Sequence, residues 1–299
     1  MKANPFVSVV TSVHNEEHCI GTLLTLLMQQ TYAHDLFEVI VVDDQSTDRT
    51  VEIIKQYPVR LICQSQKSNQ WICMNTAILQ AKGDVIATTD ADCQPTARWL
   101  TAGISSMKNQ HADLIGGGIS FLFPHGKSAS ALYDSLTFLH QQDLIERRGV
   151  AVTANLFFKK TVWEHMGGFP PQTGWSGDIA FTDKAVSSGE KIFFEKDAFI
   201  HHPARTTRQL FRKSFNIGLG KGNIIRTMGI QNLHKIFGNA VPIAMCNLNP
   251  IRLMQRMRKQ NILITIPLFL QILLVSYLCF FCAITGTSWA LIRTTKKIM

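Results

Sequence analysis

Two groups of acidic residues in this chain of 299 residues have the types and spacing to do chemistry. The first is Asp90-Ala91-Asp92, whose two carboxylates stand two positions apart. Such a pair can converge on one hard divalent cation, Mg²⁺ or Mn²⁺, which then bridges the oxygens of a diphosphate. A metal held there neutralises the charge that develops on a nucleoside diphosphate as it leaves. The same pattern also occurs in solvated turns, so the surrounding elements decide between the two interpretations.

The second acidic group is D-D-Q-S-T-D-R-T, residues 43–50. An acid at the end of a parallel strand can accept hydrogen bonds from a base or a ribose, and Asp43 or Asp44 stands in that position. The alternative is a helix start, because Asp, Ser and Thr are good N-cap residues. Both hold if Ser46 or Thr47 caps the next helix while an aspartate faces a nucleotide.

The elements around these groups alternate between strand and helix. Short β-branched runs predict buried parallel strands, and leucine-rich or capped stretches between them predict helices. The predicted strands cover residues 6–12, 37–42, 59–63 and 85–89, and the helices 20–30, 50–57 and 71–81. This order predicts an α/β, Rossmann-like, mostly parallel sheet that binds ligands at the carboxyl ends of its strands. Both acidic groups fall at such ends.

Beyond Pro95 the alternation is looser. Further strands are predicted at residues 116–121, 151–159, 191–194 and 198–200, and further helices at 129–147, 161–166 and 178–188. Residues 206–226 are basic and amphipathic, which suits phosphate groups or anionic lipid as well as a plain solvated surface. Residues 262–284 carry no charge and are long enough for a C-terminal transmembrane helix. We therefore expect three parts, 1–205, 206–260 and 261–299.

The charge balance favours anionic partners, which can be nucleic acid, phosphorylated small molecules or a membrane surface. The chain has 30 Lys and Arg against 21 Asp and Glu, a net charge of +9, and 46% hydrophobic residues. Its seven cysteines show no disulfide spacing, which is typical of a reducing cytosol. The N-terminus lacks a signal-peptide pattern. We expect a protein of the inner (cytoplasmic) membrane whose catalytic domain faces the cytosol, with no nucleic acid among its partners.

Four motifs in order resemble the inverting family 2 glycosyltransferases of the GT-A fold. They are V-S-V-V-T-S-V-H-N-E-E, V-V-D-D-Q-S-T-D-R-T, T-T-D-A-D-C and the stretch 153–169, T-A-N-L-F-F-K-K-T-V-W-E-H-M-G-G-F. The resemblance covers about residues 5–225. It implies transfer of a sugar from a nucleotide-diphosphate sugar to a lipid-linked or membrane-proximal glycan. The expected donor is a UDP-sugar.

The resemblance also implies roles for individual residues. Asp44 or Asp43 binds the nucleobase, Asp90 contacts the ribose or metal-bound water, and Asp92 ligates Mg²⁺ or Mn²⁺. Asp178, after the Gly-Gly-Phe turn, is the catalytic base, although its position also suits a helix N-cap. The remaining residues assigned to the nucleotide sugar are Thr11, Asn15 and Glu16. In His201-His202-Pro203, His202 is the preferred candidate for a ligand of the metal or pyrophosphate, and the alternative is a plain loop histidine before a proline.

Three departures from the family pattern are visible. A Gly-Lys pair is replaced by Ser68-Asn69-Gln70-Trp71, and Gly177 stands where the first of two adjacent acids is usual. The Gln-x-x-Arg-Trp signature of processive synthases is absent, so we expect single-sugar transfer. The first two departures leave a catalytically inactive membrane scaffold as the alternative function.

A dinucleotide oxidoreductase is disfavoured because no G-x-G-x-x-G follows the first strand.

Overall fold

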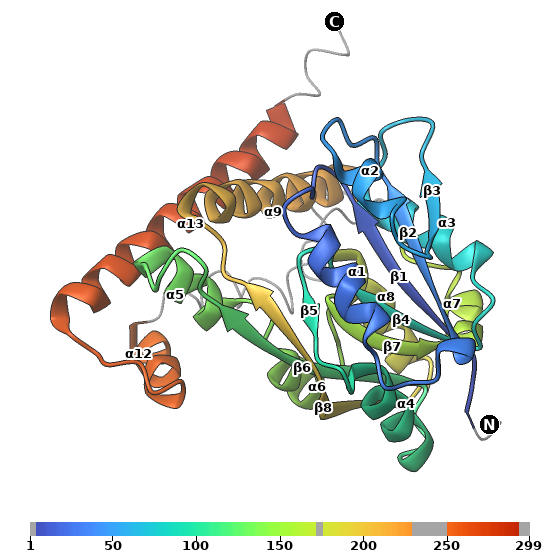
Figure 1. The fold of residues 1–299 in the computed structure, drawn as a ribbon. Helices are drawn as coiled ribbons and strands as arrows, with labels where there is room; N and C mark the ends of the chain where they lie inside the picture. The colour runs from blue at the N-terminus through green and yellow to red at the C-terminus, as the bar shows by residue number, and fades with distance from the viewer. Residues whose placement is uncertain (1–3, 172–175, 229–249, 293–299) are drawn as a thin grey trace, which may run out of the picture. The chain divides into compact units, whose positions relative to one another are not determined.

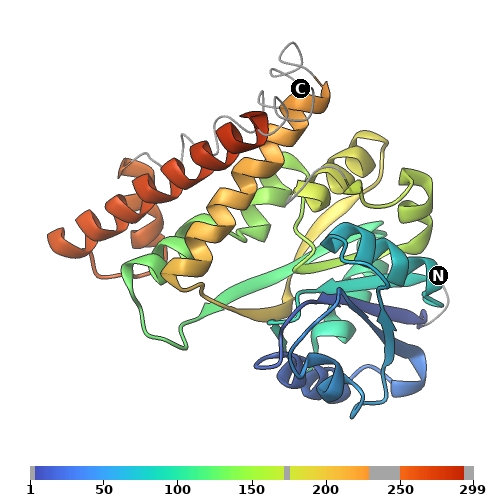
Figure 2. The same ribbon diagram turned by 90° about the horizontal axis from the view of Figure 1, so that it is seen from above.

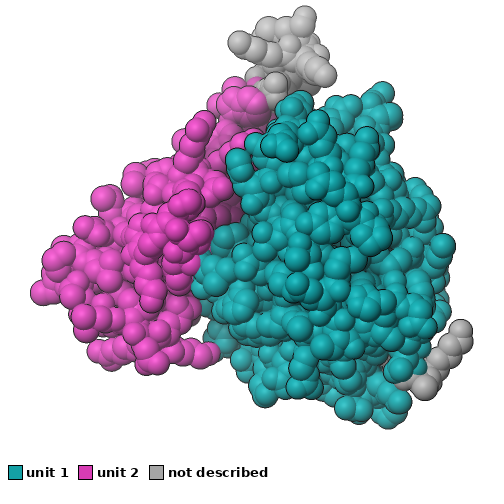
Figure 3. All heavy atoms as spheres, in the orientation of Figure 1, with its two compact units in different colours: residues 1–122, 139–171, 177–203 teal, residues 123–138, 172–176, 204–299 magenta. Residues whose placement is uncertain are grey.

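The computed structural model describes residues 4–171, 176–228 and 250–292 (Figure 1). Contacts divide the chain into two compact units, coloured separately in Figure 3. Unit 1 comprises residues 1–122, 139–171 and 177–203, and unit 2 comprises residues 123–138, 172–176 and 204–299. The domain boundaries predicted after residues 205 and 260 stay predictions.

Unit 1 contains one eight-stranded sheet in the order β3-β2-β1-β4-β7-β6-β8-β5. Its strands are β1 Val7–Val13, β2 Phe37–Asp43, β3 Arg60–Cys63, β4 Val85–Thr89, β5 Gln94–Pro95, β6 Leu114–Leu122, β7 Asn155–Lys159 and β8 Ile192–Pro203. The first four strands in the sheet order are parallel, so their carboxyl ends meet at one edge. Strand β7 runs antiparallel to both neighbours, and β6 and β8 are parallel to each other. The predicted α/β, mostly parallel architecture is confirmed.

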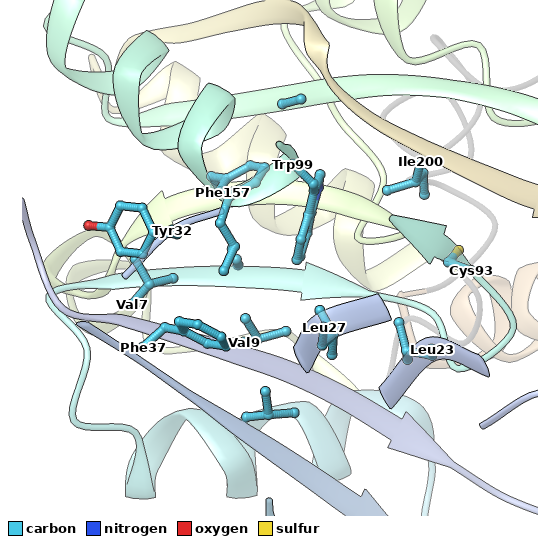
Figure 4. Packing of buried hydrophobic residues seen from close by; sticks show 14 of the residues in the cluster. Val7, Val9, Leu23, Leu27, Tyr32, Phe37, Cys93, Trp99, Phe157 and Ile200 are labelled. Atoms are coloured by element: carbon cyan, nitrogen blue, oxygen red, sulfur yellow. The ribbon is translucent and has the colours of Figure 1, made fainter. Parts of the chain in front are cut away.

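Helices cover both faces of this sheet. They are α1 Ile20–Met28, α2 Thr50–Ile54, α3 Gln70–Gln80, α4 Trp99–Asn109, α6 Gln141–Arg148, α7 Lys160–Met166 and α8 Gly177–Ser187, with the 3₁₀ turn η1 His34–Leu36. Alternate residues of β1 serve the two faces: Val9 packs with α1 and α4, and Val10 with α3 and α7. Figure 4 shows the first of these clusters, where Trp99 and Phe157 pack with ring centroids 5.1 Å apart.

Two predictions for the chain after residue 128 are wrong. The two short strands expected within 191–200 form one strand, β8, which continues to Pro203 and shifts register opposite Gly117 and Gly118. The helix expected at 129–147 is interrupted, because Leu139 adopts a left-handed φ of 58° between α5 Ala129–Thr137 and α6. The chain thereby passes from unit 2 to unit 1 between residues 138 and 139.

The described residues of unit 2 are mainly helical and form α5, α9 Thr207–Met228, α12 Pro250–Lys259 and α13 Ile266–Ile292. Helices α9 and α13 pack side by side (Figures 1 and 2), and glycines allow the close approach. A side chain at Gly218 would meet the backbone of Ala283, and one at Gly286 would meet that of Phe215. By length and composition α13 can cross a membrane: its most apolar window has a mean hydropathy of 2.3, and 22% of that window is buried.

Candidate active site

The D-x-D motif lies in the turn between β4 and β5, at the carboxyl end of β4. The Cys93 amide donates to the Asp90 carbonyl at 3.1 Å and closes this turn. Strand β5 then pairs with β8 so that Gln94 stands opposite His201. This pairing brings the end of β8 against the aspartates, although more than a hundred residues separate them in sequence.

His202 points its Nε2 atom at the two aspartates. That nitrogen lies 3.6 Å from Asp92 Oδ1 and 3.9 Å from Asp90 Oδ2, and the histidine is fully buried. Its other ring nitrogen, Nδ1, lies 2.7 Å from the Pro203 carbonyl, which can only accept a hydrogen bond. In the neutral ring Nδ1 therefore carries the proton, and the lone pair of Nε2 faces the carboxylates, as in metal-ligating histidines.

Cys93 completes the group of potential ligand atoms, which all lie within 4.8 Å of one another. Burial raises the pKa of the Cys93 thiol well above its usual range, and the charges of Asp90 and Asp92 add to the effect. Only the thiolate ligates a metal. The residues that fit a divalent ion are therefore the two carboxylates and the imidazole, a set of hard and intermediate donors suited to Mg²⁺ or Mn²⁺.

Asp178 is buried in the first turn of α8. Its Oδ1 accepts the amide of Ile179 at 2.8 Å, and its Oδ2 accepts the amide of Thr153 at 3.4 Å. Burial raises the pKa of this carboxyl to about 7, and the negative charge of Asp90 adds to the rise. A carboxyl whose pKa is near neutral and is raised by the charge of the D-x-D motif is suited to proton transfer beside a metal site.

The second acidic group lies at the carboxyl end of β2. Asp44 Oδ1 accepts the amide of Ser68 at 2.7 Å and its hydroxyl at 3.1 Å, so it organises the loop before α3. Asp43 accepts the amide of Ser46 at 3.1 Å within its own turn. Both carboxyls are nearly buried. Sequence reasoning missed Ser68 as the partner of Asp44, since 24 positions separate them.

The predicted cap by Ser46 or Thr47 is wrong. The Ser46 hydroxyl accepts the amide of Asn15 at 2.9 Å, and the Asn15 side chain accepts the amide of Thr47 at 2.8 Å. The amide of Thr50, where α2 begins, is bound by Asp48 Oδ1 at 3.0 Å. Asn15 adopts a left-handed φ of 58°, which asparagine tolerates better than most residues. The loops after β1 and β2 are thus tied together at the sheet edge.

Comparison with known proteins agrees with this geometry. The profile of the family described as glycosyl transferase family 2 matches residues 8–162. Glycosyltransferase AglE of Haloferax volcanii is 34% identical over 282 residues, 92% of each chain. This chain belongs to glycosyl transferase family 2.

Two more distant proteins are also similar to this glycosyltransferase, one in sequence and one in structure. A protein of Methanococcus voltae named dolichyl N-acetyl-alpha-D-glucosaminyl phosphate 3-beta-D-2,3-diacetamido-2,3-dideoxy-beta-D-glucuronosyltransferase is 23% identical over 74% of each chain. The mannosyltransferase PcManGT from Pyrobaculum calidifontis, solved with GDP-Man and Mn²⁺, superposes with a TM-score of 0.64 at 18% identity. The match covers 96% of this chain and 88% of that one, and it shows the fold. The predicted family and the GT-A fold are confirmed.

Glu16 and Thr11, both from the first motif of the glycosyltransferase, have different surroundings. Glu16 is partly buried, and burial raises the pKa of its carboxyl, opposed by the bond from the Cys19 thiol at 2.9 Å. The charges of Asp92 and Asp90 raise it further, so Glu16 belongs to the same electrostatic site. The Thr11 side chain is fully buried, and its hydroxyl has no hydrogen-bond partner among the described residues.

Asn155 of β7 holds the strand that carries His202, a role that the sequence did not reveal. Its amide nitrogen donates to the carbonyls of Gly118 at 2.9 Å and Ala198 at 2.8 Å. Its amide oxygen accepts the indole N–H of Trp99 at 2.8 Å. These bonds fix the register shift between β6 and β8, and so fix where β8 delivers His202.

Proposed function

We propose that this glycosyltransferase moves a single sugar from a nucleotide-diphosphate sugar to a lipid-linked or membrane-proximal glycan, with inversion of the anomeric configuration. The preferred donor in this proposal is a UDP-sugar. The observation that carries the proposal is the convergence of His202 Nε2 on Asp90 and Asp92 at the carboxyl end of β4. The buried Asp178 carboxyl, whose pKa is raised by burial and by the charge of Asp90, supports the proposal.

Asp178 is the base in this proposal. Inverting transfer needs one carboxylate that takes the proton of the acceptor hydroxyl as this hydroxyl attacks the anomeric carbon from the side opposite the diphosphate. A pKa of about 7 leaves a substantial fraction of Asp178 ionised near neutral pH while keeping the carboxylate basic. The two backbone amides that bind its oxygens hold the carboxyl in place for this transfer.

Asp92 and His202 hold the divalent metal, and Asp90 contacts the ribose or metal-bound water. When bound, Mg²⁺ or Mn²⁺ supplies the positive charge that stabilises the departing nucleoside diphosphate. The proton on His202 Nδ1, fixed by the Pro203 carbonyl, keeps Nε2 available as a ligand. The carboxylates of Asp90 and Asp92 are about one-third exposed, so substrate can reach them.

The nucleotide sugar lies at the edge formed by the ends of β1, β2 and β4. Asp44 or Asp43 meets the nucleobase, while Asn15 and Glu16 line the site from the loop after β1. Thr11 lies near the carboxyl end of β1, and its buried hydroxyl, which has no hydrogen-bond partner among the described residues, is assigned to the nucleotide sugar. The hydrogen bonds between the loops after β1 and β2 hold Asn15 beside the turn that follows Asp43 and Asp44.

A membrane location with the catalytic unit on the cytosolic side of the inner membrane completes the proposal. It is supported by the length and composition of α13 and by the dolichyl phosphate substrate in the name of the M. voltae relative. Such an acceptor is confined to the membrane, so an enzyme attached there meets it at high effective concentration.

The anomeric configuration of the product tests the inverting assignment. Proton NMR of the product made from an α-linked donor gives a β-linkage if the proposal holds, and a retained α-linkage would rule it out. The inactive-scaffold alternative makes a different prediction: genetic complementation by Asp92→Asn and Asp178→Asn then equals that of wild type. Under the enzyme proposal both variants fail to complement although they accumulate normally.

A further inference from the structure

The charges of this chain are divided unevenly along its length. From Ala198 to the C-terminus the sequence holds 14 Lys and Arg and no Asp or Glu. The first 197 residues hold the other 16 Lys and Arg and all 21 acids. Most of the positive charge of unit 2 therefore has no acidic counterpart in the same part of the sequence.

Asp134 is the one acid in the sequence of unit 2, and it is not at the surface. Its side chain is fully buried in α5, where it binds the amide of Arg205 at 2.9 Å and the guanidinium at 3.2 Å. This pair neutralises one cation internally. The exposed surface of the described part of unit 2 therefore carries basic side chains and no carboxylate.

Helix α12 divides its residues between two faces. Leu253 and Met257 are buried with apolar residues of α5 and α13, and Arg256 donates to the Leu136 carbonyl at 2.7 Å. The other face is exposed and carries three cations, Arg252, Arg258 and Lys259. Packing thus fixes the roll of the helix and presents its cationic face outward.

Large apolar side chains are exposed beside these cations. Ile251 is 65% exposed, and Leu263 and Ile266, between the end of α12 and the start of α13, are 81% and 78% exposed. Cations alone suit any polyanion, including nucleic acid. Cations next to exposed aliphatic side chains, directly before a helix able to cross a bilayer, suit a membrane surface with anionic headgroups.

We propose that α12 and residues 260–266 form a docking surface for the anionic lipid headgroups of the membrane in which α13 sits. The inference rests on the membrane location proposed above and adds the charge class of the lipid. The cations of α12 contact lipid phosphates, while Ile251, Leu263 and Ile266 enter the interfacial layer. This fixes how unit 2 is seated at the membrane surface, independently of sugar transfer.

Native mass spectrometry of the full-length protein in mild detergent tests the surface. Phosphatidylglycerol and phosphatidylcholine are added separately, and bound lipids are counted. The test variant is Arg252→Gln/Arg258→Gln/Lys259→Gln, and the matched control removes three exposed lysines of unit 1, Lys55→Gln/Lys82→Gln/Lys108→Gln. Arg256 is left intact because it holds α12 to α5.

Wild type and the control are expected to bind phosphatidylglycerol at least about tenfold more tightly than phosphatidylcholine, and the α12 variant is expected to lose this preference. Equal binding of the two lipids by wild type, or equal loss in both triple variants, would overturn the proposal. So would an unchanged lipid preference in the α12 variant together with weakened binding of a short single-stranded RNA. Because lipids are counted without sugar donor, none of these outcomes depends on transferase activity.

Discussion

Gly177 lies directly against the indole ring of Trp71: a Cβ atom at position 177 would stand 2.5 Å from that ring. Trp71 is 2% exposed, and its ring packs on Phe169 with centroids 5.4 Å apart. These are two of the positions at which the sequence departs from the family pattern. The departures are therefore one structural feature, in which a tryptophan in α3 occupies the space beside α8 that a side chain at position 177 would need.

Gly177→Ala is expected to displace the start of α8 and with it Asp178, the next residue. We expect nucleoside diphosphate release to fall at least about tenfold, because a displacement of about 1 Å at a catalytic group costs up to a hundredfold. Overpacking should also lower the free energy of unfolding by about 1–3 kcal/mol. Steady-state kinetics and urea unfolding measure the two effects.

Gly21→Ala in α1 is the matched control, since its added Cβ meets its nearest atom at an ordinary 3.5 Å. It is expected to keep full activity and to gain up to about 1 kcal/mol of stability. Adding Trp71→Phe to Gly177→Ala should restore part of the lost activity because the smaller ring gives way. A double variant no better than Gly177→Ala would contradict this relationship between the two residues.

His202→Gln is expected to weaken Mn²⁺ binding by at least about tenfold, because it removes an imidazole from the ligand group. His201→Gln is the control: His201 Nδ1 bonds to the Ser120 hydroxyl at 2.8 Å, and its side chain lies on the other side of β8. Isothermal titration with Mn²⁺ in the presence of nucleoside diphosphate measures the affinity. Equal affinities in the two variants would remove His202 from the metal site.

The buried Asp178 carboxyl predicts a pH dependence of stability. Its pKa is about 7 in the folded protein against an ordinary value of 3.8, so in this range the unfolded chain has lost a proton that the folded one keeps. Stability should thus fall as pH rises, by about 1.4 kcal/mol per pH unit between pH 5 and 7, and level off above about pH 7.

Asp178→Asn removes this titration while keeping the shape of the side chain. The difference in unfolding free energy between the variant and wild type, measured with EDTA present, should therefore move in favour of the variant from pH 5 to pH 7. A difference that does not change with pH would mean that the carboxyl is ionised in the folded protein throughout this range.

The sequence predicted the first half of unit 1 closely and the second half less well. Strands β1, β2 and β4 are buried β-branched runs that end at polar or acidic residues, so hydrophobic pattern alone marks them. Strand β8 was divided in the prediction because Glu195, Lys196 and Asp197 interrupt its apolar pattern, at the place where its register shifts. The break at Leu139 has no Gly or Pro to announce it.

The sequence indicated the site's acids but not the contacts that connect them. Asp90 and Asp92 were marked by their spacing and His202 by a motif, and the pairing of β5 with β8 brings them together. The contact between Trp71 and Gly177, and the bonds of Asn155 that hold β8, depend on tertiary packing over long sequence separations. No local pattern encodes such contacts.

The most direct test of the proposed sugar transfer is release of nucleoside diphosphate from a panel of UDP- and GDP-sugars by the full-length protein. Wild type is compared with Asp92→Ala, Asp178→Asn and the control His201→Gln. We predict that one donor is consumed, that EDTA stops the reaction and Mn²⁺ or Mg²⁺ restores it, and that only the control keeps its rate. For Asp178→Asn the expected loss is on the order of 10³-fold. If no donor is consumed and none binds by calorimetry, or if the two aspartate variants match wild type, the proposed function is wrong.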